Sequence, residues 1–368
     1  MKIALVTEFF FPTTGGTQTV VASLAERLAG RGRQVTVLAP LADRSPWPAQ
    51  PEESYTVRWF RLRSLPFAGY LLVQRAIGAS LGPFEVIHLF HPAFGLGALW
   101  ATRRPGQRFV ATLMGYDTYA FHAMPWLKRR IALAACRQAD ALTAPSNDLA
   151  RLASETGVRR EIEIIPHGIS PALAAPDRAT SLRRSLGIEP GQTVFVAVQR
   201  HCPIKEPAVF LDAWQRLARP DCRLILVGGG ELEPVLRRRA DMLNLGGLTV
   251  VGEVPREDVI THLAVADVFV HHSHYESFGL GIVEAMQAGL PVIACAVGAV
   301  PEIVTDGVEG LLIPPLDPEA MAEAMARLAD SATERARLGA AARERSSQFH
   351  WDRIVEQYER LYEGDLVR

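Results

Sequence analysis

The stretch HHSHYESFGLGIVEAMQAGLPVIACAVGAVPEIV, residues 271–304, decides the fold. It follows the run 267–270, which predicts a buried strand because it is short, apolar and contains β-branched side chains. Gly279 then allows a sharp turn, and Ile282–Ala288 has helical spacing up to Gly289, a residue that caps helices. The stretch therefore predicts a strand, a glycine-rich turn and a helix.

The turn and its two flanking acids predict a ligand site. The amides of Phe278, Gly279 and Leu280 would lie at the helix N-terminus, where unpaired N–H groups and the helix dipole favour a phosphate. Glu276 and Glu284 bracket the turn, and both can offer carboxylate oxygens to vicinal hydroxyls, which suits a sugar attached to a nucleotide. Taken singly, each acid has a simpler explanation, since Glu284 also complements the helix dipole and Glu276 fits a solvated loop.

Composition narrows the class of protein. A chain of 368 residues is long enough for two domains. A net charge of -1 gives no overall attraction to nucleic acid, so we expect no nucleic-acid partner. Four cysteines without a C-x-x-C pair indicate neither a zinc site nor a disulfide framework, which favours a cytoplasmic protein. The apolar stretch after Met1 is too short for a signal peptide and no apolar run is long enough to span a bilayer, so we expect neither a signal peptide nor a membrane-spanning segment.

The N-terminal half begins with a strand, a helix and a strand, at Lys2–Thr7, Thr17–Ala29 and Gln34–Ala39. This order predicts a βαβ unit and a parallel sheet. Gly15 and Gly16 precede the helix and would let the backbone approach a ligand, although a simple tight turn explains them as well. Further strands are expected at Val57–Arg61, Glu85–Leu89, Arg108–Thr112, Ala141–Ala144 and Glu163–Ile165.

The C-terminal half begins with a strand at Gln192–Gln199, followed by Arg200, Lys205 and a helix at Pro207–Ala218. Two fixed cations directly after a strand can stabilise a departing diphosphate without a metal ion, although either one alone fits ordinary surface charge. Strands are also expected at Arg223–Val227 and Leu248–Val251, and a last helix at Arg353–Glu363.

Three histidines, His271, His272 and His274, end the strand at 267–270. Strand alternation would send neighbouring side chains to opposite faces, and the sequence contains no D-x-D motif. We therefore expect no metal site.

The motif around the two glutamates resembles a known signature. Glu276-Ser277-Phe278-Gly279, Glu284-Ala285, the following AGLPVI at 288–293 and PEIV at 301–304 are similar to the EX7E signature of retaining GT-B glycosyltransferases, the family 4-like "glycosyl transferases group 1". The resemblance implies an α/β protein with the GT-B fold, in which two Rossmann-like domains with parallel sheets face each other across a cleft. The implied parts are an acceptor-side domain at 1–170, a linker at 171–187, a nucleotide-sugar-binding domain at 188–348 and a terminal helix at 349–368 that crosses back.

The same resemblance implies roles for the donor-side residues. Arg200 and Lys205 resemble the Arg and Lys of the family's GRLxxxKG segment, with Gln199 and Glu206 in place of its two glycines. This pair would stabilise the diphosphate, so that no metal ion and no cofactor are needed. The donor substrate would be a nucleoside diphosphate sugar, with UDP or GDP as the nucleotide.

Other donor contacts follow from the family pattern. Glu284 would hold the ribose hydroxyls and Glu276 the sugar hydroxyls. The glycine loop containing Gly16 would face the diphosphate, and Val254, in the segment GEVP, would lie beside the base. The amides of residues 278–280 would bind phosphate.

The acceptor side departs from the family pattern. Many relatives carry a histidine before the glycine of the segment ATLMG, and this chain has Met114 there. His91, Asp117 and His122 are the acceptor-side candidates, although a surface or core histidine is the competing explanation for His91 and His122.

Two segments, 58–63 and 125–130, combine basic and aromatic residues. Such segments can hold a protein at an anionic membrane surface, and many relatives glycosylate lipids. The alternatives are a strand with alternating faces for the first segment and plain solvated charge for both.

Our hypothesis is a retaining glycosyltransferase that moves a hexose-type sugar to a lipid or glycan acceptor. The alternative is a catalytically impaired sugar-nucleotide-binding protein. It rests on four departures from the family pattern, which are Met114, Gln199, Glu206 and Ser170, the last standing where relatives often carry Asp after an IPHG segment.

Overall fold

A computed structural model describes the chain except residues 12–14, 43–54, 63–65, 102–103, 172–173 and 365–368. The chain divides into two compact units. Unit 1 comprises Met1–Gly168 together with Trp351–Arg368, and unit 2 comprises Ile169–His350. The prediction of an α/β protein with two Rossmann-like domains is confirmed, because each unit is built on a parallel sheet.

The sheet of unit 1 has seven strands in the order β3-β2-β1-β4-β5-β6-β7. Each neighbouring pair is parallel, as the alternation of strands with helices predicts. The strands are β1 Lys2–Val6, β2 Gln34–Ala42, β3 Thr56–Leu62, β4 Val86–Phe90, β5 Arg108–Thr112, β6 Ala141–Ala144 and β7 Glu163–Ile164.

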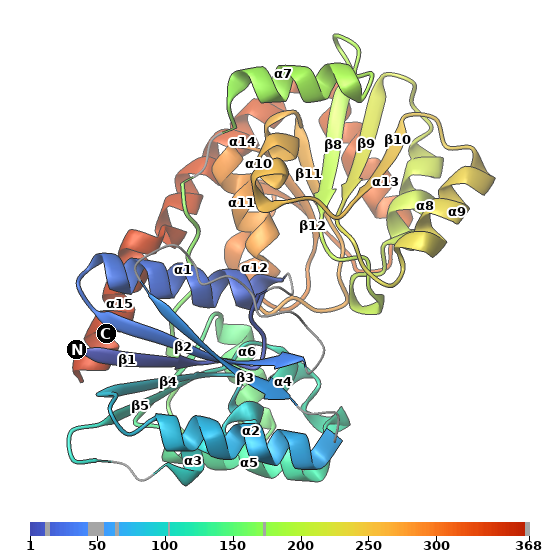
Figure 1. Ribbon diagram of the computed structural model, residues 1–368. Coiled ribbons are helices and arrows are strands. Elements are labelled where there is room, and N and C mark those ends of the chain that lie inside the picture. Colours follow the sequence, from blue (N-terminus) through green and yellow to red (C-terminus); the bar gives the residue numbers. More distant parts are fainter. Residues whose placement is uncertain (12–14, 43–54, 63–65, 102–103, 172–173, 365–368) are drawn as a thin grey trace. The chain divides into compact units, whose positions relative to one another are not determined.

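Helices cover both faces of this sheet. Figure 1 shows α1 and α15 on one face and α2, α3 and α5 on the other. The helices of unit 1 are α1 Gly16–Gly30, α2 Pro66–Ser80, α3 Leu96–Trp100, α4 Tyr116–Tyr119, α5 Trp126–Gln138, α6 Asn147–Glu155 and α15 Trp351–Glu363.

The last helix, α15, is fixed to unit 1 by buried and exposed contacts. The ring of His88 on β4 joins it to the sheet, with Nδ1 2.6 Å from the Tyr362 hydroxyl and Nε2 2.6 Å from Thr112 Oγ1. At the surface, Arg31 Nη1 donates to Glu359 Oε2 at 2.9 Å. Burial lowers the pKa of His88 to about 3, so the imidazole stays neutral and can bridge two hydroxyls.

The sheet of unit 2 has six parallel strands in the order β10-β9-β8-β11-β12-β13. The strands are β8 Thr193–Val198, β9 Cys222–Val227, β10 Leu248–Gly252, β11 Val268–His271, β12 Val292–Cys295 and β13 Gly310–Ile313. The helices are α7 Pro176–Ser185, α8 Ala208–Leu217, α9 Glu233–Leu243, α10 Arg256–Ala264, α11 Leu280–Ala288, α12 Val300–Ile303, α13 Pro318–Asp330 and α14 Ala332–Ser346.

Each face of this second sheet has its own apolar core. On β8, Phe195 and Ala197 pack with α8 and α13, whereas Val194 and Val196 pack with α10, α11 and α14 on the opposite face (Figure 1). A strand that is buried on both faces needs apolar side chains on both, which is why 194–198 is a continuous apolar run.

The expected linker at 171–187 contains a helix, α7. Pro176 occupies its first turn, where a missing N–H costs nothing, but none of its side chains is buried. Its apolar residues are few and only partly buried, with Ala179, Leu182 and the following Leu186 packed against the unit 2 core, so the helical pattern in the sequence is weak. Polar bonds also hold it to unit 2, from Arg178 to Asp258 at 2.5 Å and from Arg183 to the Val265 carbonyl at 2.7 Å.

The two ends of unit 2 pair with each other. The Ile169 amide donates to the Phe349 carbonyl at 2.8 Å, and Ile169 forms a β-bridge with His350. Among the helices of the described residues, none combines the length and the apolar character that crossing a membrane requires.

Candidate active site

The candidate site of unit 2 lies where the strand order reverses. β8 and β11 are neighbours in the sheet, and the chain continues from β8 to β9 on one side and from β11 to β12 on the other. The loops that leave the carboxyl ends of two such strands diverge, which opens the usual ligand position of a doubly wound sheet. Here the loop after β8 carries Lys205, and the loop after β11 carries Glu276.

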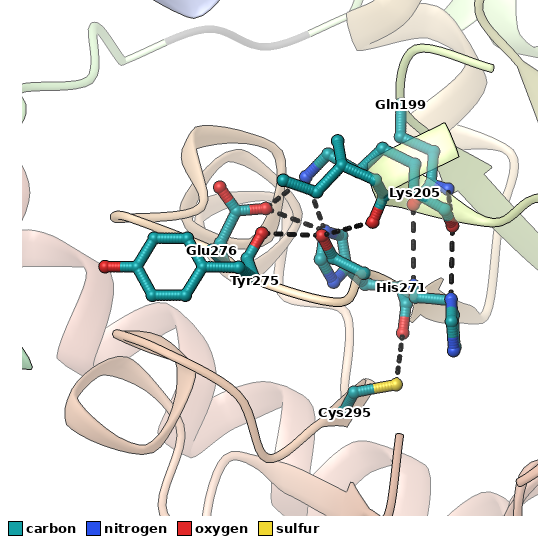
Figure 2. A network of polar contacts seen from close by, with 9 residues as sticks. Gln199, Lys205, His271, Tyr275, Glu276 and Cys295 are labelled. Carbon is teal, nitrogen blue, oxygen red and sulfur yellow. Dashed lines mark hydrogen bonds and ion pairs between the residues drawn. The ribbon is translucent and has the colours of Figure 1, made fainter. Parts of the chain in front are cut away.

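A lysine, a glutamate and a histidine meet at this point (Figure 2). Lys205 Nζ forms an ion pair with Glu276 Oε2. His271, the last residue of β11, places Nε2 3.2 Å from the same oxygen and 3.5 Å from Lys205 Nζ. The Lys205 and Glu276 side chains are 18% and 14% exposed, so the charges are largely shielded from water yet still accessible to a ligand.

The protonation states of this cluster follow from burial and its neighbours. Burial raises the pKa of Glu276, but Lys205 and His271 outweigh that effect and bring the pKa down to about 2. Burial lowers the pKa of His271, and the nearby Lys205 charge lowers it further. At neutral pH the site therefore holds a carboxylate and a neutral imidazole beside the lysine.

Gln199 and His272 fix the backbone of Lys205. Gln199 Nε2 donates to the Lys205 carbonyl at 3.3 Å, and the His272 ring lies 3.1 Å from that same oxygen. Gln199 Oε1 also accepts from the His272 amide at 3.4 Å. In this chain Gln199, which stands at a glycine of the family pattern, thus joins the two loops of the site (Figure 2).

Glu206 stands at the other glycine of that pattern. Its φ is 37°, in the left-handed region that glycine adopts with least strain. His274 Nε2 lies 3.7 Å from Glu206 Oε2, which gives the substituted side chain a neighbour in the second loop.

The backbone of Glu276 is held by the turn after β12. The Ala299 amide donates to the Glu276 carbonyl at 2.8 Å, and Gly298 packs so closely that a Cβ there would lie 2.2 Å from this oxygen. Gly298 also has a φ of 52°. Only glycine can combine this close approach to the Glu276 carbonyl with a positive φ without strain.

Helix α11 begins beside the cluster. Gly279 precedes it with a φ of 100°, and Gly289 ends it with a φ of 82°, as the glycine pattern predicts. The amides of Leu280 and Gly281 belong to the first turn, which lacks intrahelical acceptors. A Cβ on Gly281 would lie 3.1 Å from the Val198 carbonyl, so the helix start packs directly on the end of β8. Phe278 is buried beneath the turn.

Glu284 lies further along α11 and pairs with Arg256 on α10, with 2.7 Å between Arg256 Nη2 and Glu284 Oε1. Burial raises the pKa of Glu284, and Arg256 opposes that shift. Both residues line a cavity of about 230 Å³ between the two helices.

The structure thus brings together some predicted donor-side residues. Lys205 and Glu276 are in contact, and Glu284 lies on α11, which begins at Leu280, the last of the three residues with predicted phosphate-binding amides. Arg200 is exposed directly after β8, and Val254 is half-buried in the loop between β10 and α10. No group of three or more metal-ligating side chains is found within the described parts of the chain.

The remaining predicted residues belong to unit 1. Gly16 is the first residue of α1, and His122 is exposed on a short 3₁₀ turn. His91 follows β4, is buried and has a φ of 65°, and burial lowers its pKa to about 3. Met114 is buried after β5. Asp117 belongs to α4, but its side chain lies outside what the structure describes.

Two site residues were not predicted. His271 was considered only as a metal ligand, although its place at the carboxyl end of a central strand is a signal for a site residue. Arg256 gave no signal, because its pairing with Glu284 spans 28 positions of sequence.

Comparison with known proteins agrees with this architecture. Residues 179–345 match the family described as "Glycosyl transferases group 1", and residues 14–173 match "Glycosyltransferase Family 4". A phosphatidyl-myo-inositol mannosyltransferase of Mycobacterium leprae is 30% identical over 99% of this chain and 96% of its own length. An O-antigen chain mannosyltransferase C of Escherichia coli is 27% identical over 98% of both chains.

Solved structures give the same fold. Sucrose-phosphate synthase from Thermosynechococcus elongatus superposes with a TM-score of 0.83, at 26% identity and 98% coverage of both chains. The HepE protein of Anabaena, solved with UDP and glucose, superposes with a TM-score of 0.84 at 21% identity, over 99% of this chain and 100% of its own. The chain therefore belongs to the group 1, family 4-like glycosyltransferases and has their GT-B fold.

Proposed function

We propose that this chain is a retaining, metal-independent glycosyltransferase that moves a hexose-type sugar from a UDP or GDP donor to a lipid or glycan acceptor. One observation carries the proposal. Lys205, Glu276 and His271 converge at the switch point of the unit 2 sheet, beside the N-terminus of α11.

The chemistry follows from charge. The donor diphosphate would bind the first amides of α11, with Arg200 and Lys205 as its cations. When the bond from the sugar to the phosphate oxygen breaks, negative charge develops on the diphosphate, and these cations would stabilise it more strongly than they stabilise the intact donor. No divalent cation is needed for that step.

Glu276 would position the sugar. Its carboxylate is ionised, and its neighbours Lys205 and His271 fix where its oxygens point. Bonds to the sugar hydroxyls would hold the reacting carbon in place, so the acceptor oxygen attacks from the face that the leaving diphosphate vacates. The departing phosphate oxygen takes the acceptor proton, and the configuration is retained.

The names of the relatives support a hexose donor and an acceptor related to inositol lipids. The Mycobacterium leprae relative is a phosphatidyl-myo-inositol mannosyltransferase, and a relative from Saccharomonospora viridis is a D-inositol 3-phosphate glycosyltransferase. A lipid acceptor would also explain why the start of α5 combines an apolar and a basic side chain at the surface. Trp126 there is 68% exposed, and Arg130 follows one turn later. We propose that this end of α5 touches an anionic membrane surface.

The other basic and aromatic segment fits a membrane contact less well. Trp59 on β3 is half-buried, and its ring lies 5.8 Å from that of Phe10. Arg63, the last residue of that segment, lies outside the described residues.

Transfer assays with UDP- and GDP-hexoses test the proposal, with phosphatidylinositol vesicles as the acceptor and EDTA present throughout. We expect turnover, an unchanged anomeric configuration by ¹H NMR, and a loss of about 10²- to 10³-fold in kcat for Lys205→Ala and Glu276→Gln. Turnover that needs added Mg²⁺ would overturn metal independence. Nucleotide binding without transfer or donor hydrolysis would instead favour a sugar-nucleotide-binding protein.

A further inference from the structure

The ion pair between Arg256 and Glu284 is asymmetric. Arg256 is the first residue of α10, and Glu284 lies within α11. The Arg256 side chain is 54% exposed, whereas that of Glu284 is 18% exposed. The bond of 2.7 Å to Glu284 uses one of the five N–H groups of the guanidinium, and more than half of the side chain stays accessible.

Distances along α11 relate this pair to a bound nucleotide. A helix rises about 1.5 Å per residue, so Glu284 lies about 6 Å along the axis from Leu280. If the diphosphate binds at Leu280, as the proposed function requires, the ribose next to it reaches Glu284. The base is attached to that ribose, and the Arg256 guanidinium already contacts the Glu284 carboxylate.

The cavity beside the pair suits a planar ring. Its volume is about 230 Å³, below the range of about 300–1,000 Å³ for pockets that hold a whole drug-sized ligand, so it fits one part of a nucleotide. Val259 and Ile260 of α10 supply apolar wall, and Arg256, Glu284, Gln287 and Arg343 supply polar groups, of which Arg256 is the one paired with Glu284. Apolar surface matches the face of a base, and polar groups match its edge.

A guanidinium has donors only, and this limits which base edge it can read. Guanine offers the O6 and N7 acceptors, and uracil offers a carbonyl at position 4. Adenine and cytosine carry an amino group at the corresponding place, which sets donor against donor. Resting on the proposed function, we propose that Arg256 determines base specificity, by selecting donors with an oxo base, uracil or guanine, over donors with an amino base.

Two matched nucleotide pairs test this directly. UDP and CDP share their ribose and phosphates and differ at position 4 of the ring in carbonyl against amino. GDP and ADP differ in carbonyl against amino at position 6 and also in the 2-amino group of guanine, so UDP and CDP are the stricter pair. Calorimetric titration of the full-length wild type should show on the order of tenfold tighter binding of the oxo member in at least one pair. In Arg256→Ala that preference should fall to within about twofold.

Two further variants separate the effect of the Arg256 charge from that of its planar shape, and both from the loss of any exposed arginine. Arg256→Lys keeps a positive charge beside Glu284 but lacks the planar fork, so it should bind nucleotides yet discriminate less between bases. Arg178→Ala is the matched control, because Arg178 is another exposed arginine that pairs with α10, through Asp258 at 2.5 Å and not through Glu284. Its base preference should equal that of the wild type.

The outcomes distinguish this inference from the proposed function. Nucleotide binding with the same base preference in wild type and Arg256→Ala overturns the role of Arg256 and leaves the glycosyltransferase proposal standing. Equal affinity of the wild type for both members of each nucleotide pair would likewise overturn the role of Arg256 and leave the glycosyltransferase proposal standing. A wild type that binds none of the four nucleotides overturns both.

Discussion

His271 Nε2 lies 3.2 Å from Glu276 Oε2, the oxygen that Lys205 also contacts. Because burial keeps the imidazole neutral, only one ring nitrogen carries a proton, and the short distance assigns that proton to Nε2, which donates to the carboxylate. Glu276 thus accepts from a neutral donor and from a cation, and the two fix its orientation.

Removing the His271 imidazole, the neutral donor to Glu276, should lower turnover moderately. We expect His271→Ala to lower kcat about tenfold, less than Lys205→Ala, because the ion pair remains and only one hydrogen bond is lost. His271→Gln, which keeps an N–H donor, should recover part of the rate. Steady-state kinetics of the three variants check this order, and a loss in His271→Ala equal to that in Lys205→Ala would contradict it.

The depressed pKa of Glu276 predicts acid sensitivity of the fold. The group has an ordinary pKa of 4.5 and a pKa of about 2 in the folded protein, so its stabilising effect is complete above pH 4.5 and disappears as the pH falls towards 2. Up to about 3 kcal/mol of unfolding free energy is involved. Urea unfolding between pH 6 and 3 should show a steeper loss of unfolding free energy with falling pH in the wild type than in Glu276→Gln. Parallel curves of unfolding free energy against pH would contradict the lowered pKa of Glu276.

Gly298 should tolerate no side chain. Alanine there would bring Cβ to 2.2 Å from the Glu276 carbonyl oxygen, in addition to the cost of a left-handed backbone. Gly307 is the matched control, since its φ of 74° is also left-handed but nothing lies within 4 Å of a Cβ. Gly307→Ala should lose about 1–2 kcal/mol of stability with normal turnover, whereas Gly298→Ala should lose more stability and most of its turnover. Denaturant unfolding and kinetics of both variants decide this.

Tyr362 should matter for stability but not for chemistry. Tyr362→Phe leaves the buried His88 Nδ1 without its hydroxyl partner, which costs about 1–3 kcal/mol. Glu363, the next residue of α15, offers a comparison because it forms an ion pair at the surface with Arg33. Glu363→Gln should cost less than about 1 kcal/mol of stability. Thermal unfolding ranks the two variants, and equal midpoints would refute the role of the buried bond.

Much of the fold could be predicted because its signals are local. β5 and β6 have the predicted bounds, and α11 ends at the predicted Gly289, since apolar runs and capping glycines act over a few residues. Glu276 and Lys205 could be singled out because each follows a strand end in a recognisable motif.

The rest depends on pairings across long stretches of sequence. The contact between Lys205 and Glu276 joins positions 71 apart, and no local pattern states which atoms meet. Arg256 was overlooked because an exposed arginine at the start of a helix is common, and α7 was taken for a linker because it buries no side chain. Sequence periodicity reports burial, and neither feature contains a fully buried side chain.

The pairing of Ile169 with Phe349 and His350 has a consequence for modularity. Unit 2 is one continuous segment whose first and last residues are already hydrogen-bonded, so it is topologically an insert within unit 1. A segment with adjoining ends can be excised or exchanged without stretching the host chain. Transplanting residues 169–350 between relatives should therefore carry donor preference from one glycosyltransferase to another. Recombination at the two adjoining ends of this segment would combine a new donor preference with an existing acceptor preference.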